Sequence, residues 1–129
     1  MGFFDKIKDT MKQIKEENAG FGAAMKRMNA PGFCGNVNRG VKNGDFWEGS
    51  YLSVEDGKCV IYGSNQPDYF FVGSDVESLE QASTAKIMIS KGNEQHTALR
   101  YIITFKDGKR AQADIMDIKI SEVKLTLNL

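Results

Sequence analysis

The sequence is poor in the residues from which catalytic and metal sites are most often built. Its 129 residues include one histidine, two cysteines, two prolines and one tryptophan. Zinc sites with several histidine ligands, histidine dyads and di-iron carboxylate–histidine bundles cannot be assembled from His96 alone. No apolar run approaches the roughly 18 residues that a membrane-spanning helix needs. The length suits a single soluble domain with one core and an appendage.

The first residues also lack the apolar stretch of a secretory signal, because charged side chains recur at Asp5, Lys6 and Lys8. Without an export signal, Cys34 and Cys59 are expected to be reduced thiols. Cys59 lies in a strand-like pattern and is predicted to be a small core residue. The protein is therefore expected to be cytoplasmic.

Charges of opposite sign are present in equal numbers, 17 of each, but they are segregated along the chain. Residues 1–44 carry eight basic and four acidic side chains (+4), residues 45–84 one and eight (−7), and residues 85–129 eight and five (+3). Neither basic excess is large enough for the phosphate contacts of a nucleic-acid binder, so no nucleic-acid partner is predicted. The acidic middle either balances its flanks within one fold or offers a surface to a basic partner.

An amphipathic helix is predicted over residues 3–18, within an N-terminal helical segment spanning residues 1–28. Its apolar stripe follows the i, i+4, i+8, i+11 spacing of one helical face. The stripe can cover an open face of the following β domain, dock on a partner or a second copy, or lie on a membrane surface. Membrane binding is the least favoured, because residues 1–18 hold four Lys and four acids. The stripe consists of Phe3, Phe4, Ile7, Met11 and Ile14.

Composition changes abruptly after this segment. Residues 29–44 contain four Asn, four Gly and Pro31, which are typical of turns, so a linker or long loop is predicted there. From residue 45 to residue 129 the pattern becomes strand-like. Short strands are expected over residues 46–54, 59–62, 69–72, 76–80 and 86–90, which favours an antiparallel sandwich or barrel. The predicted fold class is therefore α+β, with a helical segment followed by a mainly antiparallel β domain.

Two hairpins are marked by Asp-Gly pairs. Asp56-Gly57 lies between β-forming residues, which is a strong hairpin signal. With a three-residue loop over residues 106–108, the apolar residues of both strands lie on the same face of the second hairpin. A two-residue loop would place apolar residues of one strand opposite polar residues of the other. The small alanines of this hairpin predict that something bulky packs over them. The predicted pairs are Phe105 with Lys109, Ile103 with Ala111, and Tyr101 with Ala113.

The tail over residues 123–129 alternates with period two and is predicted to be a last strand. A short closing helix that begins near Ser121 is the alternative. His96 lies in a polar stretch and is predicted to be in a solvated loop.

Over about residues 56–115, the order and spacing of the predicted strands and turns resemble those of bacterial pleckstrin-homology-like or GRAM-like domains. The similar segments are Asp56 to Tyr62, Tyr69 to Val72 followed by Asp75 to Leu79, and Tyr101 to Lys109. The resemblance implies a seven-stranded, strongly bent antiparallel sheet closed by a C-terminal helix, and a role as an interaction scaffold. Phosphoinositide-binding members carry clustered Lys and Arg in the first hairpin loop. The loop at Asp56-Gly57 is acidic, so lipid binding is not expected.

No catalytic or metal site can be picked out from the residue order. Cys34 lies in a Gly-rich stretch, but no third residue is indicated that would orient a Cys34–His96 dyad. The acids at Asp68, Asp75 and Glu77 lack the spacing of a calcium loop. No catalytic residue, metal or cofactor is therefore predicted.

These observations predict a non-enzymatic interaction or scaffold module. Its partner would be a protein, a peptide or a second copy of the chain, bound by the N-terminal stripe, an exposed β edge or exposed aromatics. The rival hypothesis is a small-ligand binder or enzyme with a pocket in the β domain lined by the same aromatics. These candidate residues are Trp47, Tyr51, Tyr69, Phe70 and Phe71.

Overall fold

The computed structural model describes residues 24–37, 49–63 and 66–129. The helix predicted over residues 3–18 lies outside these ranges, and residues 24–28 are helical. The described elements are β1 (Phe33–Val37), β2 (Ser50–Glu55), β3 (Lys58–Gly63), β4 (Gln66–Phe71), the 3-10 helix η1 (Gly73–Asp75), β5 (Val76–Gln81), β6 (Ile87–Lys91), β7 (Glu94–Phe105), β8 (Arg110–Met116) and α2 (Ile120–Thr126).

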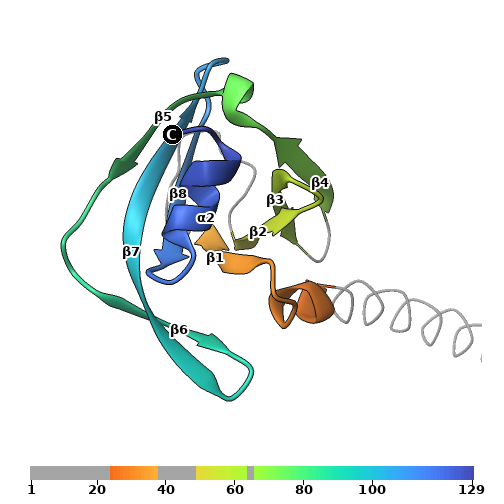
Figure 1. Ribbon diagram of the computed structural model, residues 1–129, viewed down its shortest axis with the longest axis vertical. Coiled ribbons are helices and arrows are strands. Elements are labelled where there is room, and N and C mark those ends of the chain that lie inside the picture. The colour runs from red at the N-terminus through yellow and green to blue at the C-terminus, as the bar shows by residue number, and fades with distance from the viewer. Residues whose placement is uncertain (1–23, 38–48, 64–65) are drawn as a thin grey trace, which may run out of the picture.

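All the described strands belong to one antiparallel sheet, which curls into a half-barrel (Figure 1). The strand order is β4-β3-β2-β1-β8-β7-β5, and β6 pairs with the first part of β7. Helix α2 lies within the curl (Figure 1). The predicted antiparallel β domain is thus present in the described residues.

The main core fills the space between the inner face of the curled sheet and α2. The alanines of β8 lie in this core together with larger apolar residues, which include Val123 of α2 and Leu127 directly after it. Three aromatic rings, Tyr69, Phe71 and Phe105, pack against one another with centroids 5.0–5.9 Å apart. The buried members of the core are Cys34, Val37, Leu52, Cys59, Ile61, Phe71, Val76, Tyr101, Ile103, Phe105, Ala111, Ala113, Ile115, Val123 and Leu127.

Both predicted hairpins are confirmed. Asp56 and Gly57 join β2 to β3 with φ of 53° and 75°, the left-handed pair of a type I′ turn. In the β7–β8 hairpin, Tyr101 pairs with Ala113 and Ile103 with Ala111. The Phe105 N–H donates to the Lys109 carbonyl at 2.8 Å, and Gly108 has a φ of 89°. The three-residue loop and its register follow the prediction.

The loop predicted over residues 29–44 is wrong for residues 33–37, which form β1 between β2 and β8. Gly35 indicated a turn because glycine is rare inside strands. Its role is a close approach of two backbones: a Cβ at position 35 would lie 1.7 Å from the Asp114 carbonyl oxygen of β8. Because β1 precedes β2 and pairs with it, Asp56-Gly57 closes the second hairpin of the sheet. The first connection, between β1 and β2, spans residues 38–49.

The strand predicted over residues 123–129 is also wrong, and the alternative helix is present as α2. Val123 and Leu127 are buried, whereas Leu125 and Leu129 are exposed by 77% and 57%. The buried pair has the i, i+4 spacing of a helix, and a strand would have placed all four residues on one face.

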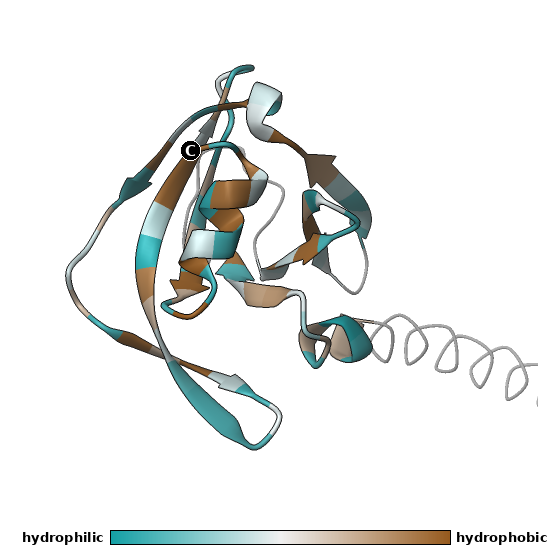
Figure 2. Ribbon diagram, viewed as in Figure 1, coloured by the Kyte–Doolittle hydropathy of each residue, from teal (hydrophilic) through white to brown (hydrophobic). Residues whose placement is uncertain are grey.

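His96 lies in β7, opposite Ile89 of β6, so the predicted loop is wrong at this position. The far end of the β6–β7 hairpin is largely hydrophilic (Figure 2), which explains why its sequence indicated a loop. Where this hairpin joins the sheet, a second apolar cluster forms from Phe33, Ile89, Ala98 and Met116, with Met28, Tyr51 and Ile87 packed against it.

Candidate functional site

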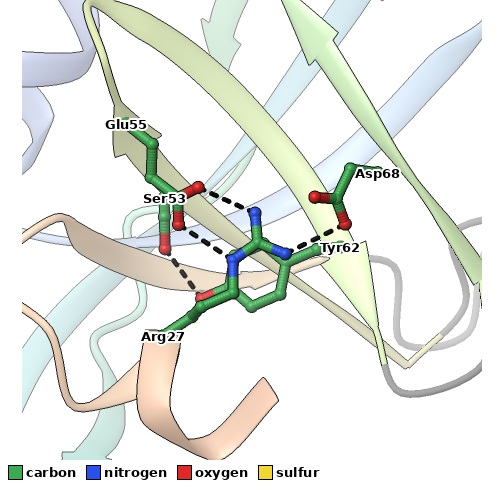
Figure 3. Close-up of polar contacts among 5 residues, drawn as sticks. All are labelled: Arg27, Ser53, Glu55, Tyr62 and Asp68. Atoms are coloured by element: carbon green, nitrogen blue, oxygen red, sulfur yellow. Dashed lines mark hydrogen bonds and ion pairs between the residues drawn. The ribbon is translucent and has the colours of Figure 1, made fainter. Parts of the chain in front are cut away.

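Arg27 of helix 24–28 contacts three side chains of the sheet (Figure 3). Its Nε and Nη2 donate to the two carboxylate oxygens of Glu55 at 2.9 and 2.8 Å, and its Nη1 donates to Asp68 Oδ1 at 2.9 Å. The guanidinium carbon lies 3.9 Å from the centre of the Tyr62 ring. We call Glu55, Tyr62 and Asp68, together with Ser53, the arginine site.

Tyr62 is held in place independently of Arg27. Its hydroxyl and the Ser53 hydroxyl share a hydrogen bond of 2.7 Å, and both residues are buried. Burial raises the pKa of Tyr62 to about 12, so the phenol stays neutral at physiological pH. The ring therefore presents a fixed, uncharged face to the guanidinium.

The arginine site lies on the outer face of the sheet, opposite α2. Leu52 and Ile61 point into the main core, and the next residues along each strand, Ser53 and Tyr62, point the other way. Arg27, Glu55 and Asp68 keep 25–38% of their side-chain surface exposed. Salt bridges this exposed contribute at most about 1 kcal/mol each, so the contact is specific rather than strong.

A second surface is the outer edge of β5. Within the described residues, β5 pairs with β7 and with no other strand, so its outer edge is open. The Ala82 N–H donates to the Arg100 carbonyl of β7 at 2.8 Å. Because peptide groups alternate in direction along a strand, the N–H and carbonyl groups of Gln81 and Leu79 point away from β7. These groups face the open side of the strand, where another strand can pair with them.

Exposed leucines lie near the start of this edge. The C-terminal end of α2 packs against η1, where a Cβ at Gly73 would lie 2.3 Å from the Leu127 carbonyl oxygen. Leu125 and Leu129 flank Leu127 and are mostly exposed. On β5 itself, Glu77 and Glu80 are exposed acids. The edge thus combines outward-facing backbone groups with negative charge, and the exposed leucines lie near η1, which precedes β5.

The opposite edge, β4, is less open to pairing. Pro67 has no N–H to donate, and the Asp68 carboxylate is bonded to Arg27. Proline and charge are common means of protecting an edge strand. The described sheet thus has three edge strands: β4 is protected, whereas β5 and β6 each pair only with β7 and have an open outer side.

Among the predicted site residues, the four that the structure describes differ in burial and in the cluster they contact. Phe3, Phe4, Ile7, Met11, Ile14 and Trp47 lie outside the described residues. Tyr51 is half-buried against the second cluster, and its ring centre is 5.9 Å from that of Tyr62. Tyr69 packs on the main core, Phe71 is 2% exposed within it, and Phe70 is 49% exposed on β4. Phe71 is thus a core residue.

Arg27, Glu55 and Asp68 are not among the site residues predicted from the sequence. The signal that could have found them is the charge segregation, because Arg27 belongs to the basic segment and both acids to the acidic middle. Pairing between specific members of these segments depends on the fold, since Glu55 and Asp68 meet only when β2, β3 and β4 lie side by side.

The two thiols do not form a reactive site. Cys34 and Cys59 are free and buried in the main core, and burial raises the pKa of each thiol from 9.0 to about 12. A thiol in this setting is protonated and a poor nucleophile at neutral pH. Cys34 donates a weak hydrogen bond to the Gly32 carbonyl at 3.3 Å. Cys59 is the small core residue that the sequence predicted.

Within the described ranges, no three His, Cys, Asp or Glu side chains are grouped to hold a metal ion. No helix within the same ranges is long and apolar enough to cross a membrane. The first connection of the sheet, residues 38–49, holds Arg39 and Lys42 but also Asp45 and Glu48, so its sequence contains no net basic cluster.

Comparison with known protein families, with curated proteins and with solved structures found no match to this chain.

Proposed function

We propose that this chain is a non-enzymatic interaction module of pleckstrin-homology-like fold that binds a peptide strand of a protein partner along the outer edge of β5. The fold part of the proposal is supported by seven strands along one curled path and by α2 at the end of the chain. A bent antiparallel sheet closed by a C-terminal helix is what the sequence resemblance implies. The stripe of Phe3, Phe4, Ile7, Met11 and Ile14 stays a prediction as a second docking element.

The observation that carries the binding proposal is the open outer side of β5, which carries exposed acids and begins directly after η1. An added strand would bond to the outward peptide groups of Leu79 and Gln81, as in other cases of β-strand addition. Main-chain bonds supply affinity in this mode, and alternate side chains supply specificity. Leu125 and Leu129 favour apolar side chains on the peptide, and Glu77 and Glu80 favour Lys or Arg.

A selection of random peptides on the full chain tests this proposal. We expect enriched peptides that alternate apolar and basic residues and bind in an extended conformation. Gln81→Pro removes the outward N–H of residue 81 and should abolish binding, whereas Gln81→Ala keeps this N–H and should bind within about threefold of the wild type. Isothermal titration calorimetry measures both variants.

Equal binding of the selected peptides to Gln81→Pro and Gln81→Ala would exclude the β5 edge as the binding surface. Circular dichroism of the two variants shows whether they remain folded. Gln81→Pro should remain folded, because the N–H that it removes does not bond to β7.

A further inference from the structure

The arginine site belongs to the sheet alone. Glu55, Tyr62 and Asp68 come from β2, β3 and β4, which are joined by their own ladders. The Ser53–Tyr62 hydrogen bond orients the ring without help from helix 24–28 (Figure 3). The placement of the three strands and the orientation of the Tyr62 ring therefore do not depend on Arg27.

Its chemistry is selective for a guanidinium. Glu55 accepts two parallel hydrogen bonds, Asp68 accepts a third from another nitrogen, and Tyr62 contacts the plane of the group. A guanidinium is planar and offers a fork of donors, whereas an ammonium is a compact point charge that cannot make the parallel pair. A lysine side chain in the same place would lose both the fork and the stacking.

We propose that Glu55, Tyr62 and Asp68 form a binding site for an arginine-bearing peptide, which Arg27 occupies in cis and which an arginine of a protein partner takes over. Two negative charges beside an aromatic face define the ligand as a guanidinium side chain. Besides Arg27, helix 24–28 makes apolar contacts through the buried Ala24 and through Met28, which packs against the second cluster, whereas Met25 is 43% exposed. Displacing this short helical segment therefore exposes the site and uncovers part of the second cluster, but it leaves the main core closed. The site is distinct from the β5 edge, which lies at the other end of the strand order.

The test opens the site by substitution in the full chain. Arg27→Ala removes the internal ligand, and Lys26→Ala is the matched control, because Lys26 is an exposed cation on the same turn. The probe is a capped peptide that copies residues 22–30, together with a version that has lysine in place of Arg27. Nuclear magnetic resonance follows the Tyr62 ring and the Ser53 amide during titration.

We expect the arginine peptide to bind Arg27→Ala about tenfold more tightly than Lys26→Ala, in which Arg27 still competes. The lysine peptide should bind Arg27→Ala about tenfold more weakly than the arginine peptide. Adding Glu55→Gln to Arg27→Ala should remove most of the binding, because the charged acceptor of the parallel pair is lost.

Equal binding of the arginine and lysine peptides, or equal binding to Arg27→Ala and Lys26→Ala, would overturn the proposal. Binding that shifts other resonances but leaves those of the Tyr62 ring and the Ser53 amide unchanged would also overturn it. If Arg27→Ala does not fold, Arg27→Lys keeps a cation and most of the stem at this position. The arginine peptide should then bind Arg27→Lys more tightly than it binds the wild type. Equal or weaker binding to Arg27→Lys would overturn the proposal.

Discussion

At the scale of the residue, burial keeps three titratable side chains in their neutral, protonated forms. The thiols of Cys34 and Cys59 and the phenol of Tyr62 are each shielded from water, and burial raises the pKa of all three to about 12. Each group is therefore neutral when the protein folds at pH 7.

This charge state predicts a loss of stability in alkaline solution. In the unfolded chain the thiols release their protons near their ordinary pKa of 9.0, whereas in the folded chain they keep them until about pH 12. The unfolding free energy is therefore highest below pH 9 and falls as the pH rises from 9 towards 12. Urea unfolding measured at steps across this range should show the decrease.

The control for this prediction is the double variant Cys34→Ala, Cys59→Ala. Its unfolding free energy should be lower at pH 7, because two buried groups become smaller, but it should fall less steeply above pH 9. An identical slope in both proteins would show that the thiols are not responsible for the alkaline sensitivity.

At the scale of the element, α2 is the piece whose burial pattern differs most from the sequence prediction. Leu127 is 1% exposed in the main core, and Leu125, two residues earlier, is 77% exposed. Leu127→Ala should lower the unfolding free energy by about 2–5 kcal/mol. Leu125→Ala should change it by less than about 0.5 kcal/mol. Urea unfolding of the two variants measures the difference.

A strand over residues 123–129 would place Leu125 and Leu127 on the same face, so the two alanine variants would then lose similar stability. A large difference between them is expected only for the helix.

The elements that the sequence predicted correctly are those with local signals. Asp56-Gly57 and residues 106–108 determine their hairpins through turn chemistry and register within a few residues. β1 and the arginine site could not be predicted in this way, because they depend on contacts between distant segments. Gly35 is explained only by the backbone of β8, and Arg27 only by Glu55 and Asp68.

At the scale of the whole molecule, the two faces of the sheet and its edge strands have different surroundings. α2 fills the inner face, and helix 24–28 contacts the outer face through Arg27. Pro67 and the ion pair of Asp68 protect the β4 edge, and the β5 edge is open within the described residues. The zero net charge is therefore the sum of oppositely charged segments, and part of the basic N-terminal segment pairs with part of the acidic middle.

The most direct test of this account is hydrogen exchange of individual β5 amides in the full chain, with and without a selected peptide. The Leu79 and Gln81 amides point outwards and should become protected when the peptide binds, whereas the Glu80 amide, which faces β7, should change little. Unchanged exchange at Leu79 and Gln81 in the presence of bound peptide would contradict strand addition at β5.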